Sequence, residues 1–429
     1  MIRRDRYLNR LIDKKENGLI KVVTGIRRCG KSFLLFEIYH RYLNSIGVPD
    51  DHIIELALDD DLNARYRNPL ELGNYVRSLI SDDGMYYVFL DEIQKVVTVN
   101  NPYVPDGADR IGFVDVLLGL MKIKNADIYV SGSNSRMLST DILTEFRGRG
   151  DEIRVHPLSF AEYYSACEDK RHAWRDFFTY GGMPLTLSQK NHEDKAKYLR
   201  DLFDKIYLDD IIARRRISAA KSVLDELLDV VSSSVGSLTN PSRIAKTFSS
   251  VRGRRIDEET AARYLDYFED AFMLYKARRY DVKGRKYIGS PFKYYFSDVG
   301  LRNAILNFRQ QEENHIMENI IYNELLIRGC SVDVGFVPYN FKEDGKSRRA
   351  NLEVDFVANR GSKRYYIQSA FAIPDEEKRL QETRPLINSG DSFKKIIVVR
   401  DDIVPWHDEK GILYLGIEEF LLNEAAMDA

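Results

Sequence analysis

Eight residues near the N-terminus, from Gly25 to Ser32, have the types and spacing of a phosphate-binding loop. They fit the pattern GxxxxGK[ST] without a mismatch and follow the apolar segment Leu19 to Val23. Two glycines permit a tight turn whose backbone N–H groups point at one anion, and the dipole of the next helix adds to the attraction. We expect Lys31 to reach the β- and γ-phosphates of a nucleotide and the Ser32 hydroxyl to bind Mg²⁺. The candidate nucleotide-binding residues are Gly25, Ile26, Arg27, Arg28, Cys29, Gly30, Lys31, Ser32 and Phe33.

A second chemical feature is the pair of acids, Asp91 and Glu92, that ends the apolar segment Tyr86 to Leu90. In a parallel sheet, the end of such a strand lies beside the phosphate-binding loop. Asp91 can hold Mg²⁺ through water and Glu92 can orient an attacking water, so the pair favours hydrolysis over transfer to a small substrate. The expected cofactors are therefore ATP and Mg²⁺. The alternative is a strand that merely ends in an acidic turn.

Two further residues are candidates for contacts with the γ-phosphate. The segment Asp127 to Val130 is followed by a run of Ser, Gly and Asn in which Asn134 is the candidate sensor of the γ-phosphate. Arg149, in the run Arg-Gly-Arg, could place a guanidinium on that phosphate in its own subunit or in a neighbouring one, so an oligomer is compatible with the sequence. The alternatives are an ordinary polar turn and a solvated basic loop.

The elements that must position these residues follow from the pattern of apolar runs. In the first third of the chain, short apolar segments alternate with helical stretches, which predicts a parallel α/β sheet. The expected strands are Leu19 to Val23, Ile53 to Leu58, Tyr86 to Leu90 and Asp127 to Val130. We predict four domains: a P-loop ATPase core at 1–156, a helical lid at 157–236, a winged helix at 237–300 and a small α/β domain at 301–429.

The predicted winged helix is the most basic part of the chain. Two short helices precede a hairpin, and the segment from Pro241 to Lys293 holds 13 Lys+Arg against 7 Asp+Glu, a net charge of +6. Duplex DNA is the expected partner, and a protein-docking surface is the alternative. The candidate DNA-binding residues are Arg252, Arg254, Arg255, Arg263, Lys283, Arg285 and Lys286.

The last part of the chain places acids in the order of a PD-(D/E)XK nuclease core, a restriction-endonuclease-like fold. Glu318 lies on a predicted helix, Asp355 on a strand and Gln368 on the next strand. Gln368 stands where such a core has its second acid, and Ala370 stands where it has its lysine. With a single carboxylate at the centre, Mg²⁺ should bind poorly, so we predict a domain that packs or binds without cutting.

Several segments together resemble a large group of bacterial and archaeal AAA-type P-loop ATPases whose C-terminal part is an uncharacterised, nuclease-like domain. The segments are GIRRCGKS, LDEIQ, SGSNS, GRGDEIRVHPLSFAEYY, YGGMP and EVDFV, and they extend over nearly the whole chain. The resemblance implies the AAA-type fold and the use of ATP.

Composition excludes several other classes of protein. The chain has 429 residues, 44% of them hydrophobic and 30% charged, with a net charge of −2, which is typical of a globular protein with no overall basic surface. Three distant cysteines and the lack of an apolar run of about 18 residues favour a cytoplasmic protein outside the membrane. We therefore predict an ATP-hydrolysing switch or motor that acts on DNA. The alternatives are an ATP-gated metal-dependent nuclease and a signalling ATPase whose winged helix binds protein.

Overall fold

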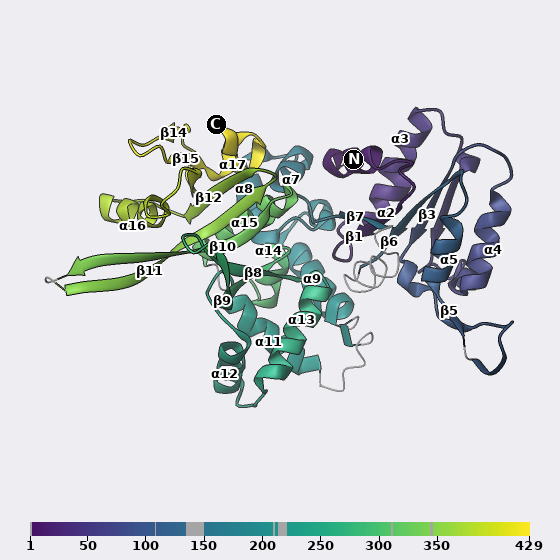
Figure 1. The fold of residues 1–429 in the computed structure, drawn as a ribbon, viewed down its shortest axis with the longest axis horizontal. Coiled ribbons are helices and arrows are strands. Elements are labelled where there is room, and N and C mark those ends of the chain that lie inside the picture. The colour runs from purple at the N-terminus through teal and green to yellow at the C-terminus, as the bar shows by residue number, and fades with distance from the viewer. Residues whose placement is uncertain are drawn as a thin grey trace. The chain divides into compact units, whose positions relative to one another are not determined.

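The computed structural model describes residues 2–107, 109–133, 150–208, 211–212, 221–309, 312–343 and 346–429 (Figure 1). They form two compact units. The first comprises Met1–Pro157 with Asp270–Phe272, and the second comprises Leu158–Glu269 with Met273–Ala429.

The first unit is built on a five-stranded sheet in which every neighbouring pair is parallel, in the order β2-β3-β6-β1-β7. The strands are β1 (Ile20–Thr24), β2 (Ile53–Ala57), β3 (Tyr86–Asp91), β6 (Ala126–Ser131) and β7 (Gly150–Arg154). Four of them were predicted to within two residues. The edge strand β7 was not predicted, because its sequence Gly-Asp-Glu-Ile-Arg contains no apolar run. Ile153 is its only fully buried residue.

Helices complete the first unit. They are α1 (Asp5–Asp13), α2 (Lys31–Phe33), a π-helix (Leu34–Tyr39), α3 (His40–Ser45), α4 (Pro69–Leu79) and α5 (Phe113–Leu120). A short ribbon of β4 (Val99–Asn100) and β5 (Arg110–Ile111) is also present. One face of the sheet forms an apolar core with α4 and α5, in which Val22, Val88 and Val130 pack with Leu72 and Leu117. This burial stabilises the three central strands.

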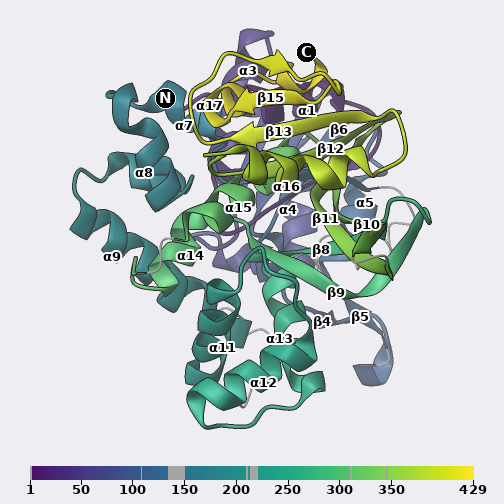
Figure 2. The ribbon, with the colours of Figure 1, turned by 90° about the vertical axis from the view of Figure 1, so that its left-hand side faces the viewer.

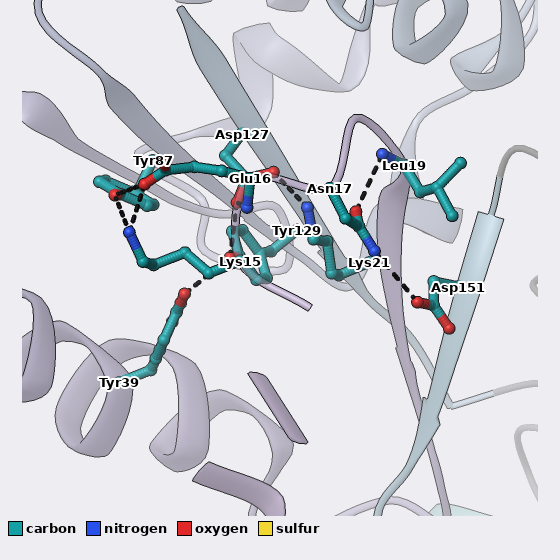
Figure 3. A network of polar contacts seen from close by, with 10 residues as sticks. All are labelled: Lys15, Glu16, Asn17, Leu19, Lys21, Tyr39, Tyr87, Asp127, Tyr129 and Asp151. Carbon is teal, nitrogen blue, oxygen red and sulfur yellow. Dashed lines mark hydrogen bonds and ion pairs between the residues drawn. The ribbon is translucent and has the colours of Figure 1, made fainter. Parts of the chain in front are cut away.

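The opposite face of the same sheet carries a buried polar network (Figure 3). Lys21 of β1 forms an ion pair with Asp127 of β6, and neither side chain is more than 5% exposed. The Tyr129 hydroxyl and the Glu16 backbone N–H donate to Asp127 Oδ2 at 2.7 and 2.9 Å. The Tyr39 and Tyr129 hydroxyl oxygens lie 2.7 Å apart. The network links the π-helix to the sheet through hydrogen bonds.

The second unit contains an eight-stranded mixed sheet in the order β14-β15-β13-β12-β11-β10-β8-β9. Its strands are β8 (Leu274–Asp281), β9 (Lys286–Phe296), β10 (Ser331–Glu343), β11 (Lys346–Arg360), β12 (Lys363–Ala370), β13 (Lys394–Val399), β14 (Trp406–His407) and β15 (Leu413–Gly416). The outer parts of β10 and β11 extend from the sheet as a long hairpin (Figure 1).

The longer helices of the second unit are α7 (Phe160–Ala166), α8 (Ala173–Tyr180), α9 (His192–Leu202), α11 (Lys221–Ser233), α12 (Pro241–Arg252), α13 (Glu258–Asp270), α14 (Val299–Ile305), α15 (Glu313–Ile327), α16 (Glu376–Ile387) and α17 (Ile417–Leu422). Figure 2 shows α11, α12 and α13 gathered at the end of this unit away from β15 and α17.

The hairpin expected as a wing has a role that the sequence did not indicate. The predicted order of helix, helix and hairpin is present as α12, α13, β8 and β9. However, β8 pairs in parallel with β10, with Tyr280 opposite Gly335, so the hairpin forms one edge of the large sheet. The division of this unit into a lid, a winged helix and a nuclease-like domain stays a prediction.

Candidate functional site

The loop after β1 has a backbone that requires glycine at two positions. Gly25 has a φ of +143°, and a Cβ atom there would lie 2.1 Å from the backbone oxygen of Val155. Gly30 precedes α2 with a φ of +100°, a region that residues with a side chain rarely adopt. The loop therefore has the tight turn that the sequence predicted, and it leads directly into the helix that begins at Lys31.

Lys31 lies folded against this loop. Its ammonium donates hydrogen bonds to the backbone oxygens of Gly25 at 3.0 Å and Ile26 at 3.1 Å, and the residue is 4% exposed. Because a lysine ammonium has three donors and a flexible stem, it can exchange these carbonyl partners for phosphate oxygens at the same loop.

The remaining residues of the loop differ in exposure. Ile26 and Cys29 are buried, and the Cys29 thiol contacts the Val155 oxygen at 3.4 Å. Burial raises the pKa of Cys29, so this thiol is not a reactive nucleophile. Arg28 and Phe33 are exposed, and Arg27 is half-buried.

The hydroxyl and carboxylate that were expected at Mg²⁺ lie side by side. Ser32 Oγ donates to Asp91 Oδ2 at 2.7 Å, and the Ser131 hydroxyl donates to the other carboxylate oxygen. Within the described ranges, no three His, Cys, Asp or Glu side chains are grouped so that they could hold a metal ion. One carboxylate and one hydroxyl nevertheless fit Mg²⁺ bound together with a nucleotide, since Mg²⁺ takes most of its other ligands from phosphates and water.

Glu92 is held next to Asp91 in an uncommon backbone conformation. Its φ is +52°, a value that non-glycine residues adopt rarely. When they do adopt it, the residue is often at a functional site. The residue is 8% exposed, its N–H donates to Ser131 Oγ at 3.3 Å, and its carboxylate accepts a hydrogen bond from Gln94. The start of α2 and the ends of β6 and β3 thus bring Ser32, Ser131, Asp91 and Glu92 together.

Two predicted residues cannot be placed in this arrangement. Asn134 and Arg149 both lie outside the described residues. Their assignment to the γ-phosphate stays a prediction.

A second polar cluster lies in the second unit and includes the three residues predicted from the nuclease-like pattern. Asp355 of β11 and Gln368 of β12 are adjacent, since the Asp355 N–H contacts Gln368 Oε1 at 3.4 Å. Glu318 of α15 joins them through a residue that sequence reasoning did not assign to this site, Lys293 of β9. The Lys293 ammonium lies 2.7 Å from Glu318 Oε1 and 3.7 Å from Asp355 Oδ1.

Lys293 adds a buried cation that the sequence pattern around Asp355 and Ala370 did not indicate. It comes from a distant strand, and it also lies 2.8 Å from Glu353 Oε1. Its sequence signal was a single cation in the otherwise apolar run Phe-Lys-Tyr-Tyr-Phe at 292–296. A charged residue in such a run has to be paired when the strand is buried.

The electrostatics of this cluster follow from burial and mutual charge. Burial alone would lower the pKa of Lys293, but the carboxylates of Glu318, Asp355 and Glu353 raise it above its ordinary value. Burial opposes ionisation of Glu318, yet Lys293 holds its pKa below the ordinary range. Burial and the Glu318 charge raise the pKa of Asp355 well above its ordinary value. Glu318 is therefore the ionised partner of Lys293.

The seven basic residues predicted to contact DNA are all exposed, but several have partners within the chain. Arg252 forms an ion pair with Asp229, and Arg254 lies 3.8 Å from Glu226, both acids of α11. Lys283 donates to the backbone oxygen of Pro338 at 2.9 Å. Arg263 donates to the Thr260 hydroxyl at 3.3 Å. The remaining three residues of the seven are Arg255, Arg285 and Lys286.

Comparison with known proteins bears on the first unit most directly. Residues 17–164, which include the parallel sheet and its loop, match the family model of an AAA domain, and residues 171–312 match a domain of unknown function. The chain is 32% identical over 407 residues to an uncharacterized protein of Haemophilus influenzae, and the match covers 93% of each. An uncharacterized protein of Methanocaldococcus jannaschii is 26% identical over 87% of this chain and 79% of that protein.

One solved structure similar to this chain is the Walker-type ATPase of Pyrococcus abyssi. It is 15% identical, with 71% of this chain and 96% of that chain covered and a TM-score of 0.44. No helix in the described part of the chain is long and apolar enough to cross a bilayer.

Proposed function

This chain belongs to the same family as the uncharacterized Haemophilus influenzae protein and carries an AAA-type P-loop ATPase domain, and on that premise we propose that it is an ATP-hydrolysing switch or motor acting on duplex DNA. ATP and Mg²⁺ are its cofactors. The observation that carries the ATPase part is the contact of Ser32 Oγ with Asp91 Oδ2 at 2.7 Å, beside the loop that holds Lys31.

Each residue has a role that follows from its chemistry. The backbone N–H groups of the loop and the Lys31 ammonium bind phosphate oxygens, and Ser32 and Asp91 hold Mg²⁺ directly or through water. The metal ion supplies positive charge that polarises the terminal phosphate. Glu92 orients the attacking water and accepts its proton, which requires a carboxylate in a fixed position. The burial and the positive φ of Glu92 support this role, because strained backbone conformations of non-glycine residues cluster at functional sites.

The DNA part of the proposal depends on the basic residues of α12, α13 and the β8–β9 hairpin. Exposed Lys and Arg side chains bind a duplex chiefly through its phosphates, in a manner that does not depend on base sequence. Lys283, Arg285 and Lys286 gather at one hairpin tip, which is a compact cationic surface. A protein-docking surface is the competing function, and the ion pairs of Arg252 and Arg254 with acids of α11 favour it.

One experiment distinguishes these functions. The ATPase rate of the purified full-length chain would be measured at low salt alone, with duplex DNA and with single-stranded DNA, and duplex binding would be measured by fluorescence anisotropy. We expect ATP hydrolysis, salt-sensitive duplex binding and a change of rate on adding duplex. A chain that hydrolyses ATP and binds no duplex would contradict the DNA part and favour protein docking. A folded chain that does not hydrolyse ATP under any of these conditions would contradict the ATPase part.

A further inference from the structure

The cluster around Lys293 resembles a cation-binding site in which the cation is the lysine side chain itself. The Lys293 side chain is 3% exposed, and its ammonium contacts carboxylate oxygens of Glu318 at 2.7 Å and of Glu353 at 2.8 Å. Asp355 Oδ1, on the same strand as Glu353, lies 3.7 Å from the ammonium. Three acids from α15 and β11 therefore surround one lysine from β9.

Other contacts fix the acids in these positions. Tyr295, also from β9, donates its hydroxyl hydrogen to Glu318 Oε1 at 2.6 Å. The Ser369 N–H donates to Asp355 Oδ2 at 2.9 Å. Buried carboxylates repel one another unless a cation lies among them, so the lysine is a condition for this arrangement. Removing it would leave the Glu318 and Glu353 oxygens, which lie 2.7 and 2.8 Å from the ammonium, without a cation between them.

A divalent metal would compete for the position of the Lys293 ammonium. Mg²⁺ and Mn²⁺ prefer carboxylate oxygens as ligands. In a metal-dependent nuclease core, residues in the order of Glu318, Asp355 and Gln368 would bind such an ion. The residues present do not fit a metal, since the oxygens of Glu318 and Glu353 that face inward are already bonded to the ammonium.

We propose that the Lys293 ammonium is a built-in cation that takes the position of a divalent metal, so that the acidic cluster of the second unit binds no metal ion. The cluster therefore joins β9 to α15 and β11 and does not carry out metal-dependent cleavage. This inference does not depend on ATP hydrolysis or on DNA binding.

The test measures Mn²⁺ binding to the full-length chain without nucleotide, by electron paramagnetic resonance of free Mn²⁺ and by isothermal titration. Every protein in the series carries Asp91→Asn, so that the nucleotide site does not contribute. We expect no Mn²⁺ binding that depends on Asp355 in the chain that keeps Lys293. Lys293→Met, which has similar volume and no charge, should gain one Mn²⁺ site per chain, and adding Asp355→Asn should abolish the gain.

A second readout and a matched control protect the test against misfolding. The melting temperature of Lys293→Met should rise with added Mn²⁺, whereas that of the chain with Lys293 should not change. Lys293→Arg keeps the positive charge and should gain no site. Mn²⁺ binding that requires Asp355 while Lys293 is present would overturn the proposal, and so would a folded Lys293→Met chain that gains no site. If Lys293→Met does not fold with or without Mn²⁺, the proposal is tested by the chain that keeps Lys293. Mn²⁺ binding to that chain that is lost on adding Asp355→Asn would overturn it.

Discussion

The Ser32 hydroxyl donates a hydrogen bond to Asp91 Oδ2 across 2.7 Å, although the two residues are far apart in sequence. Ser32 follows β1 and Asp91 ends β3, and β6 lies between these strands in the sheet. The contact exists because the carboxyl ends of parallel strands meet at one edge of the sheet. It brings together the two side chains that suit a nucleotide-bound Mg²⁺.

Replacing the loop lysine should weaken nucleotide binding. Lys31→Ala removes the ammonium that we expect on the β- and γ-phosphates. Because charge-assisted hydrogen bonds contribute ~1.5–3 kcal/mol, we expect ATP affinity to fall roughly 10- to 100-fold. Turnover should be lost. Titration with a fluorescent ATP analogue and a phosphate-release assay would measure both effects.

Lys122→Ala is the matched control for that variant, since Lys122 is an exposed lysine of the same unit, just before β6. It should bind and hydrolyse ATP as the parent does. Parental affinity and rate in a folded Lys31→Ala chain would show that the loop does not bind the phosphates.

Glu92→Gln should separate binding from hydrolysis. The amide keeps the shape of the side chain and its contact with Gln94 but cannot accept a proton from water. We expect ATP to bind as in the parent while hydrolysis falls by ~10² or more, as is typical of a lost general base. The measurements are ATP affinity and single-turnover hydrolysis. A parental rate would mean that another group orients the water.

Sequence patterns predicted the parts of the molecule whose signals are local. The loop from Gly25 to Ser32 and the acids at Asp91 and Glu92 could be identified because fully buried parallel strands are apolar runs with polar ends. Pairing between distant strands has no such local signal. The parallel pairing of Tyr280 with Gly335 and the approach of Lys293 to Glu318 both arise from contacts between distant segments. Sequence patterns therefore predicted a basic hairpin and an acidic cluster, but they did not indicate that one strand, β9, contributes to both.

The ion pair of Lys21 with Asp127 should contribute to the stability of the first unit. Removing one partner of a buried pair leaves the other charge without its ion-pair partner, which costs ~3–5 kcal/mol. We expect Lys21→Met to lower the unfolding free energy of this unit by about that amount, measured by urea unfolding followed by circular dichroism. Arg41→Met, which breaks an exposed pair with Glu37, is the control and should cost about 0–1 kcal/mol. Equal effects of the two variants would contradict a stabilising role for the buried pair.

Asp298 should make the stability of the second unit depend on pH. Burial raises the pKa of Asp298 to about 6, although the N–H groups of Gly182 and Leu301 donate to it at 2.6 and 3.0 Å. A carboxyl whose pKa is higher in the folded state keeps its proton there at pH values where the unfolded chain has lost it. Its contribution is therefore complete below the unfolded pKa and is lost as the pH rises through about 6.

Between about pH 5 and pH 7 this effect should reduce the unfolding free energy by roughly 1 kcal/mol. Asp298→Asn has no carboxyl group to titrate. The unfolding free energy of the parent relative to that of the variant should therefore fall by that amount from about pH 5 to about pH 7. Urea unfolding at the two pH values measures it. A constant difference would mean that the Asp298 carboxyl titrates alike in the folded and unfolded chain.

If the chain binds duplex DNA, the number of phosphate contacts made by the β8–β9 hairpin tip should be measurable from the salt dependence of binding. Each Lys or Arg that neutralises a DNA phosphate releases condensed counterion, so the slope of log affinity against log salt changes by ~0.9 for each contact. Replacing Lys283, Arg285 and Lys286 together by Ala should flatten this slope by roughly two to three units and weaken binding to all sequences alike. ATP hydrolysis without DNA should be unchanged.

A control triple variant tests whether position matters more than charge. Lys190, Lys197 and Arg200 are exposed cations in and beside α9, outside the basic segment, so replacing them by Ala removes the same charge. This variant should keep the parental slope. If both variants change the slope equally, the duplex is attracted by overall charge and the hairpin tip has no special role. If neither does, Arg255 becomes the next residue to replace, because Arg252 and Arg254 already have acidic neighbours in α11.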